Sequence, residues 1–248
     1  MGYWNTLHLF DDNKFYKELV PVLRGEKGCL QNDFIEFLRL YRTGGITDLS
    51  LEELKKKTDT SVSKIIEISN KFNSNFKAHN LNSDENHSLQ NNEFHYEYSR
   101  FFEYYVFKYC ADFYPHLPTG KGGLLSELDP KDNSIAFEIL ENLEDFNSVF
   151  LSDGGIINWI DLEDIEILIM SKDELFSIGP YDEEIMDYFE NYIKLFEIAL
   201  SNKLGLIRGR DMIEQSLEKL PKYKLIEKEK WIEYSFEGIF NMHFSCIE

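Results

Sequence analysis

Three histidines have a spacing that could, in principle, bind a metal. His79, His87 and His95 recur every eight residues, and carboxylates such as Asp84 and Glu93 lie near them. Imidazole and carboxylate groups are common ligands of zinc and iron. However, the chain contains neither the HExxH motif nor the Glu-x-x-His pairs of di-iron bundles. We therefore predict no metal site and no other cofactor, and we expect a solvated loop around the first two histidines.

Motifs for covalent catalysis and phosphate binding are also incomplete. No GxSxG elbow is present, and Cys29, Cys110 and Cys246 lie in no known nucleophile signature. Residues 119–123, TGKGG, lack the Ser or Thr that must follow the lysine of a phosphate-binding loop. Acids are so frequent that a catalytic pair cannot be located from proximity in the sequence. We predict that the protein is not an enzyme. An enzyme with an unrecognised carboxylate site is kept as an alternative function, after the two that are described below.

The distribution of charge is more informative than any motif. The chain carries 45 Asp and Glu against 26 Lys and Arg, a formal net charge of −19. Residues 122–202 hold twenty of these acids and three lysines, and thus seventeen of the nineteen net negative charges. A field of this sign attracts cationic partners and repels nucleic acid and anionic lipid. We therefore expect a basic protein partner and no contact with a membrane.

Composition predicts a folded protein of the cytoplasm. In a chain of 248 residues, 43% hydrophobic and 15% aromatic residues can form a large core, whereas disordered acidic chains are poor in aromatics. Three cysteines without metal-type spacing are typical of reduced thiols. We recognise no signal peptide and no uncharged stretch of bilayer-spanning length. These features favour a cytoplasmic location.

Local signals in the first third predict a strand and three helices. Residues 3–9 are rich in β-forming side chains, and Asp11 or Asp12 can cap a helix that follows them. A second helix is expected over about 32–41. Ser50 has capping-box spacing to a glutamate three residues on, which predicts the start of a third helix.

The domain organisation is predicted from a change in composition. Residues 78–92 belong to an asparagine-rich stretch with few large apolar residues, which indicates a loop or linker. We expect one globular unit over residues 1–248. The alternative is two lobes, a small helical lobe over 1–77 and a larger acidic lobe over 93–248.

The remaining elements are mostly helical. Residues 93–114 distribute aromatic side chains around a helix, which is typical of a helix in the middle of a bundle. Amphipathic helices are expected over 134–147 and 181–202, and a C-terminal hairpin over 224–246. Residues 154–170 indicate a short strand and then a helix capped by Asp161, although alternation also fits a strand there. The predicted fold class is α+β and predominantly helical, a bundle around the aromatic helix with a few short strands.

One segment resembles the helix-turn-helix of bacterial transcription regulators. Within residues 48–72, a helix over 51–57, a polar turn and a second helix that begins with serine match that motif in length. The resemblance implies the alternative function, a transcription regulator with an acidic lobe that binds a ligand or partner. The residues implied to meet DNA phosphates are Lys55, Lys56, Lys57 and Lys64.

The whole chain resembles immunity proteins of bacterial polymorphic and contact-delivered toxin systems. The resemblance is carried by an acidic, aromatic-rich composition without catalytic motifs and by the opening residues 3–11, YWNTLHLFD, with FYKELVP at 15–21. Immunity proteins neutralise a cognate toxin by occluding its active site. Many such toxins are basic because they attack nucleic acid. The resemblance therefore implies a non-enzymatic toxin inhibitor, which agrees with the charge distribution.

The predicted partner surface combines acids that steer association with one aromatic anchor. A desolvated aromatic residue commonly contributes more affinity than exposed charges. Trp159 is the predicted anchor, although a core position is the more common one for such a tryptophan. The acids assigned to the surface are Glu141, Glu144, Asp145, Asp161, Glu163, Asp164, Glu166, Asp173, Glu174, Asp182, Glu183, Glu184, Asp187 and Glu190.

Overall fold

The described segments of the chain form helices around a small antiparallel sheet, which confirms the predicted α+β, predominantly helical fold class. The asparagine-rich linker predicted over residues 78–92 lies outside these segments. The structure is a computed structural model that describes residues 5–41, 49–72, 74, 76, 95–120, 135–144, 154–173 and 183–234. Within these ranges, the side chains of residues 95, 120 and 183–188 are not described.

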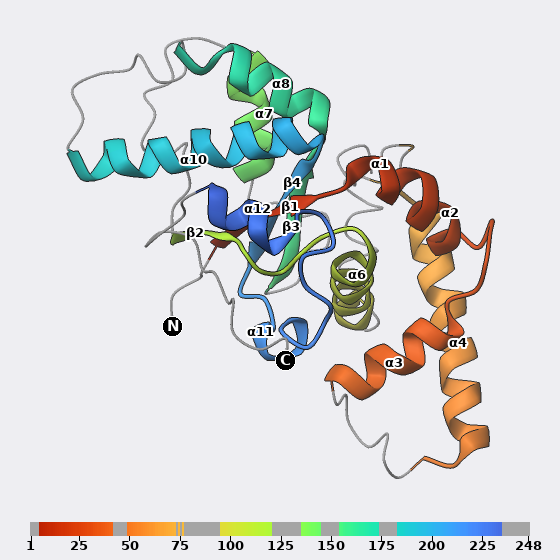
Figure 1. Ribbon diagram of the computed structural model, residues 1–248. Helices are drawn as coiled ribbons and strands as arrows, with labels where there is room; N and C mark the ends of the chain where they lie inside the picture. Colours follow the sequence, from red (N-terminus) through yellow and green to blue (C-terminus); the bar gives the residue numbers. More distant parts are fainter. Residues whose placement is uncertain are drawn as a thin grey trace.

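Within the described residues, four strands form one antiparallel sheet in the order β2-β1-β4-β3. The predicted N-terminal strand is confirmed as β1, and it lies inside the sheet between β2 and β4 (Figure 1). Residues assigned to the two alternative lobes therefore share one sheet. The strands are β1 (Asn5–Phe10), β2 (Leu117–Gly120), β3 (Gly155–Ile160) and β4 (Gly205–Arg210).

Helices lie on both faces of the sheet (Figure 1). None of the described helices is both long and apolar enough to cross a membrane. The helices on one face, which we name the N-terminal layer, are α1 (Asp12–Lys14), the π-helical η1 (Phe15–Leu19), α2 (Val20–Leu23), α3 (Gln31–Tyr41), α4 (Leu51–Ser69) and α6 (His95–Tyr109). Those on the other face, which we name the acidic layer, are α7 (Ile135–Glu144), α8 (Leu162–Met170) and α10 (Glu183–Asn202). Two short helices, α11 (Glu214–Leu217) and α12 (Lys228–Glu233), follow β4.

The strands supply two separate hydrophobic cores because successive side chains point to opposite faces. Leu7, Leu9 and Leu206 pack against the acidic layer, whereas Trp159 and Ile207 pack against the N-terminal layer. Every residue of β1 and of β3 is buried. Full burial of a large apolar side chain contributes about 1.5–3 kcal/mol, so both faces of the sheet stabilise the fold. Double burial also explains why β3, with the sequence GIINWI, shows little alternation of polar and apolar residues.

Helix α6 confirms the prediction of a buried aromatic helix. Phe101, Phe102 and Tyr104 point in different directions around it, yet none is more than 1% exposed. The Phe102 ring stacks on Phe76 with 5.7 Å between centroids and lies 6.0 Å from the ring of Trp159. The helix therefore contacts the sheet on one side and other helices of the N-terminal layer on another, and Tyr96 in its first turn remains exposed.

A buried ion pair on α6 explains the glycine at the start of β3. Arg100 Nη1 lies 2.8 Å from Glu103 Oε2, and the Tyr41 hydroxyl donates to Glu103 Oε1 at 3.2 Å. Burial raises the pKa of the Glu103 carboxyl, and the guanidinium of Arg100 opposes that shift. Gly155 has a φ of +113°, and a Cβ there would lie 2.8 Å from Glu103 Oε2. Any larger residue would therefore push against the ion pair.

Helix α4 corrects the predicted helix-turn-helix over residues 48–72. The capping box at Ser50 is confirmed, but the helix continues without a turn from Leu51 to Ser69. Thr58, Ser61 and Val62 fall at the expected turn and at the expected start of the second helix, and all three belong to the buried stripe of one continuous helix. The Thr58 hydroxyl donates to the carbonyl four residues earlier, so polar residues here do not interrupt the helix. The lysines that were predicted to meet DNA phosphates therefore lie on one continuous helix and not on a helix-turn-helix.

The predicted C-terminal hairpin over residues 224–246 is wrong for its first half. Residues Lys228–Glu233 form α12, and Trp231 is buried in the core beneath the acidic layer. Trp231 and Tyr234 are three residues apart and pack edge to face at 5.9 Å, which is the contact expected along a helix. The same aromatic spacing therefore fitted both a strand and a helix. Residues beyond 234 lie outside the described chain.

A buried histidine joins β1 to the segment that follows α6. His8 Nδ1 lies 3.0 Å from the carbonyl oxygen of Phe113, and His8 Nε2 lies 2.8 Å from Thr6 Oγ1. The ring of His116 is 4.9 Å away. Burial lowers the pKa of His8 well below its usual value, and the nearby His116 adds to the shift. A neutral ring fits these contacts, since Nδ1–H donates to the carbonyl and Nε2 accepts from the threonine hydroxyl.

This depressed pKa predicts a loss of stability in mild acid. The unfolded chain takes up a proton near pH 6.5, whereas folded His8 resists it, so its contribution to stability is complete above about pH 6.5 and falls below it. We expect the free energy of unfolding in urea to fall between pH 7 and pH 5, and to fall less in His8→Asn. The same pH dependence in both proteins would contradict the assignment.

Candidate functional site

The helices that carry most of the predicted acids lie side by side. Helix α8 packs against both α7 and α10, on the same face of the sheet (Figure 1). Their inner sides supply apolar residues such as Leu140, Ile165 and Phe196 to one core. The predicted helices over 134–147 and 181–202 are thus confirmed over the residues that the structure describes. Because the inner sides are apolar, the charged residues of the acidic layer are directed mainly outward.

The start of α8 is held by a chain of hydrogen bonds. The Trp159 indole nitrogen donates to the Tyr16 hydroxyl at 3.1 Å, and that hydroxyl donates to Asp161 Oδ1 at 3.0 Å. Asp161 is the N-cap residue, and it forms a capping box with Asp164. The predicted cap is therefore confirmed. Two of the acids assigned to the partner surface are used to begin a helix and to join the two layers.

Four residues of α8 and the following turn face solvent on one side. Glu163, Glu166, Met170 and Asp173 are exposed, at spacings of three and four residues. The spacing places Glu163, Glu166 and Met170 along one side of α8, and Asp173 follows three residues after the end of the helix. We name these four residues the α8 strip. Among the described residues, no ion pair involves the three acids of the strip, so their charges are not neutralised by lysines or arginines of this part of the fold.

A cleft of about 560 Å³ adjoins the start of the α8 strip. Asp11, Asp12 and Glu163 line it, together with Lys203 and Lys224. The ammonium of Lys224 lies 2.7 Å from the carbonyl of Phe107 and 3.3 Å from Asp112, so its charge is partnered within the fold. The cleft therefore brings acids of the N-terminal layer next to the α8 strip.

Asp12 connects the two layers at this cleft. Its Oδ2 accepts a hydrogen bond from the backbone N–H of Leu162 at 3.2 Å. Its other carboxylate oxygen is buried and has no hydrogen-bond partner among the described residues. Burial raises the pKa of Asp12, and the charge of Asp11 adds to the rise. Sequence reasoning treated Asp11 and Asp12 only as helix caps, since nothing local indicates that Glu163 lies beside them.

The predicted anchor Trp159 is corrected by its position. It is 2% exposed, and its ring lies 5.7 Å from Phe15 and 6.0 Å from Phe102. These rings belong to the N-terminal layer, whose helices cover that face of β3. Trp159 is therefore a core residue and does not reach a partner.

Glu144 is also corrected, because it lies at the end of α7 that faces the sheet. The Asn158 amide donates to the carbonyl of Asn142, and Arg208 Nη1 lies 3.4 Å from the carbonyl of Leu143. A cation at this end of a helix is favourable, since the last carbonyls carry partial negative charge. Glu144 is 8% exposed beside these contacts. It is not part of the exposed acidic surface.

The other predicted acids divide into two groups. Glu141 on α7 and Glu190 on α10 are exposed, in addition to the acids of the α8 strip. Nothing is described for the remaining ones, either for the whole residue or for the side chain: Asp145, Glu174, Asp182, Glu183, Glu184 and Asp187.

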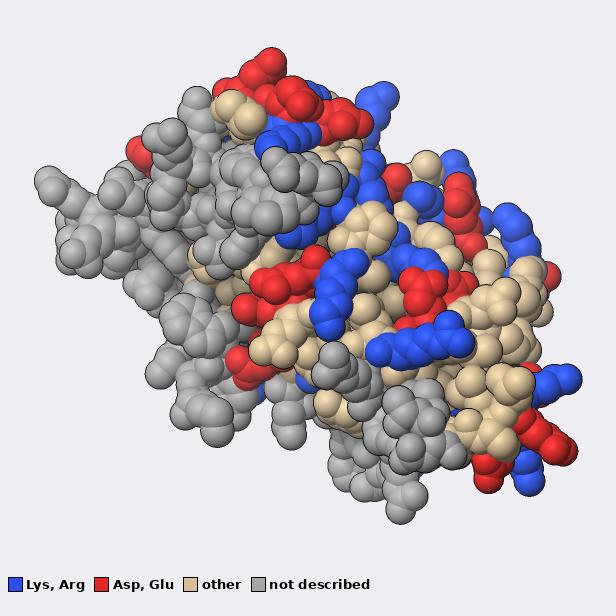
Figure 2. Space-filling model, turned by 60° about the horizontal axis from the view of Figure 1, so that its bottom comes forward, with Lys and Arg blue, Asp and Glu red and all other residues tan. Residues whose placement is uncertain are grey.

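The N-terminal layer has a different surface. Residues 1–80 hold eleven acids and twelve bases, so this part of the chain is close to neutral. Figure 2 shows Lys and Arg interspersed with Asp and Glu over much of the described surface on that side of the molecule. Lys55, Lys56 and Lys64 are exposed on α4, which also carries exposed acids. A strong field of one sign is therefore expected from the acidic layer and not from the N-terminal layer.

The described residues contain no group of three or more His, Cys, Asp and Glu side chains that could hold a metal ion. Comparisons with protein-family models, curated proteins and solved structures find no match to this chain. The function is therefore argued from the surface and the cleft alone.

The hydrogen-bond chain at α8 predicts the effect of removing one hydroxyl group. Tyr16→Phe removes the hydroxyl that accepts from the Trp159 N–H and that donates to Asp161. We expect the free energy of unfolding in urea to fall by about 1–3 kcal/mol. Tyr105→Phe is the matched control, since Tyr105 is 5% exposed and its hydroxyl makes no hydrogen bond within the described residues. Equal losses in the two variants would count against the chain of bonds.

Proposed function

We propose that this chain is a non-enzymatic acidic binding protein that inhibits a cationic protein, and that it acts as an immunity protein against a bacterial toxin. The proposal is carried by one observation. Glu163 of the α8 strip lines a cleft together with Asp11, Asp12, Lys203 and Lys224, and no lysine or arginine of the described residues forms an ion pair with the acids of the strip. Such a surface favours a partner rich in lysine and arginine.

The electrostatic part of this function is mainly kinetic. Clustered charges of one sign raise the rate of encounter with an oppositely charged protein by roughly 10- to 1,000-fold at low salt. Exposed ion pairs add little to the stability of the complex, typically about 1 kcal/mol or less each. Rapid capture suits an inhibitor that must reach a toxin before the toxin reaches its substrate.

Inhibition of this kind requires no catalytic group. A toxin that cleaves or modifies nucleic acid holds its substrate with basic residues, because phosphates dominate the affinity. An acidic surface that covers these residues competes with the substrate directly. This explains how a chain without a recognised catalytic motif can block an enzyme.

The proposal predicts a salt-sensitive complex with a basic protein encoded beside this chain. We expect the two proteins to co-purify, and the association rate in stopped-flow measurements to fall roughly tenfold or more between low salt and about 0.5 M NaCl. At low salt, Glu163→Lys should associate more slowly than the unchanged chain. Glu26→Lys is the control, since Glu26 is an exposed acid outside the acidic layer. A neighbouring protein that binds at a rate independent of salt would refute the proposal.

A further inference from the structure

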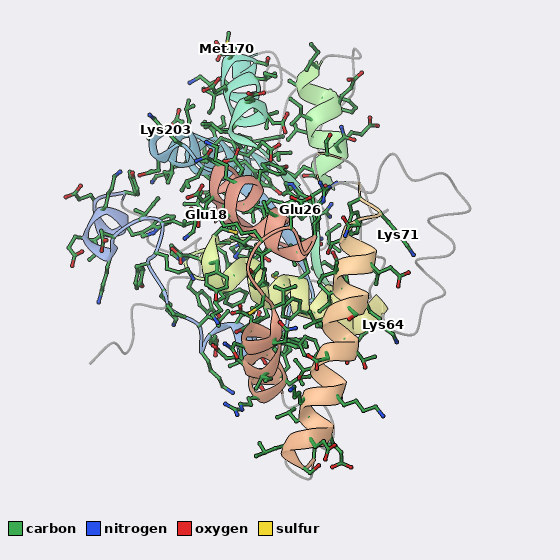
Figure 3. All side chains as sticks on the ribbon, turned by 90° about the vertical axis from the view of Figure 1, so that its right-hand side faces the viewer. Glu18, Glu26, Lys64, Lys71, Met170 and Lys203 are labelled. Atoms are coloured by element: carbon green, nitrogen blue, oxygen red, sulfur yellow. The ribbon has the colours of Figure 1, made fainter. Side chains whose placement is uncertain are left out.

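The α8 strip contains one large apolar residue among its acids. Met170 is 86% exposed, whereas Ile165 and Leu168 on the opposite side of the helix are fully buried. Figure 3 shows Met170 at the outer end of α8, where it projects away from the rest of the helix. The order along the strip is acid, acid, methionine, acid. An apolar side chain between charges matches the usual pattern of an apolar anchor within a polar rim.

A second exposed apolar residue lies at the outer end of the neighbouring helix. The last turn of α7 is bound to the sheet through Asn158 and Arg208, so its first residue, Ile135, lies at the opposite end. Ile135 is 66% exposed. Helix α8 likewise begins at the sheet, after β3, and Met170 is its last residue. The outer end of this helix pair therefore presents two apolar side chains to solvent.

We propose that the α8 strip is the docking face for the basic partner, with Met170 as its apolar anchor. The occupant is a surface of the partner that carries an apolar side chain or shallow pocket flanked by lysines or arginines. This inference rests on the proposed function and assigns the face that performs it. Met170 replaces Trp159 in the role of anchor, because it is accessible.

The charges of the strip decide between possible occupants. A second copy of this chain docked through the same face would place Glu163, Glu166 and Asp173 against acids, and like charges at contact are unfavourable. Anionic membrane lipids are repelled for the same reason. A basic protein is the occupant that satisfies both the apolar residue and its charged surroundings.

The two kinds of residue have separable roles. The acids act at long range and govern the association rate, whereas Met170 acts only at contact and governs the dissociation rate. Met170 makes few contacts within the fold, so its truncation leaves the stability of the chain nearly unchanged. A role in binding can therefore be distinguished from a role in folding.

The test uses two synthetic peptides of equal length and charge, one of lysine and serine and one of lysine and leucine, with affinities measured by fluorescence anisotropy. We expect the lysine–leucine peptide to bind this chain more tightly. Met170→Ala should lower the affinity for that peptide about tenfold, through faster dissociation, and leave the affinity for the lysine–serine peptide unchanged. Glu166→Lys should lower the affinity for both peptides. Leu51→Ala is the matched control, since Leu51 is 88% exposed but lies on α4, and it should change neither affinity.

Two outcomes would overturn the inference, and they differ in what they imply for the proposed function. If binding is salt-sensitive but Met170→Ala behaves like Leu51→Ala, the docking face is elsewhere and the proposed function survives. If neither peptide shows salt-sensitive binding, both the docking face and the proposed function fail. Thermal unfolding of each variant, followed by circular dichroism, shows that the fold is intact in every comparison.

Discussion

Burial of the sheet on both faces is the constraint from which the rest of the structure follows. Every residue of β1 and β3 is buried, so each face needs its own layer of helices. The acidic segment supplies one of these layers, and its helices must turn their apolar sides inward to form that core. The carboxylates are then left on the outer side. The exposed acidic surface is thus a consequence of how the sheet is covered.

The fold also uses some of these acids for itself. Asp161 and Asp164 begin α8, Asp12 binds the backbone of Leu162, and Glu144 is buried near Arg208. Fewer acids can therefore meet a partner than the net charge of residues 122–202 suggests. What remains is the α8 strip with a few acids of α7 and α10, beside a cleft that joins both layers. This smaller set is a more definite surface than the segment as a whole.

Features set by neighbouring residues could be predicted from the sequence, and features set by distant contacts could not. The cap at Asp161 and the capping box at Ser50 depend on residues three positions apart. The polar run of α4 was predicted as a turn because the sequence does not reveal that α3 and α6 bury one side of it. Trp159 could have faced either way, since period-two alternation does not identify the exposed side of a strand buried on both faces. The cleft unites Asp11 with Glu163 only because β1 and β3, on either side of β4, end at the same edge of the sheet.

The strand order also has a consequence for how the chain acquires its structure. Asn5 pairs with Arg210, so the central pair of the sheet joins residues from opposite ends of the described chain. Pairings of such large sequence separation are slow to form because a long loop must close first. During synthesis on the ribosome, β1 can therefore complete its pairing only after β4 has emerged, whereas β2, its other neighbour in the sheet, is made earlier.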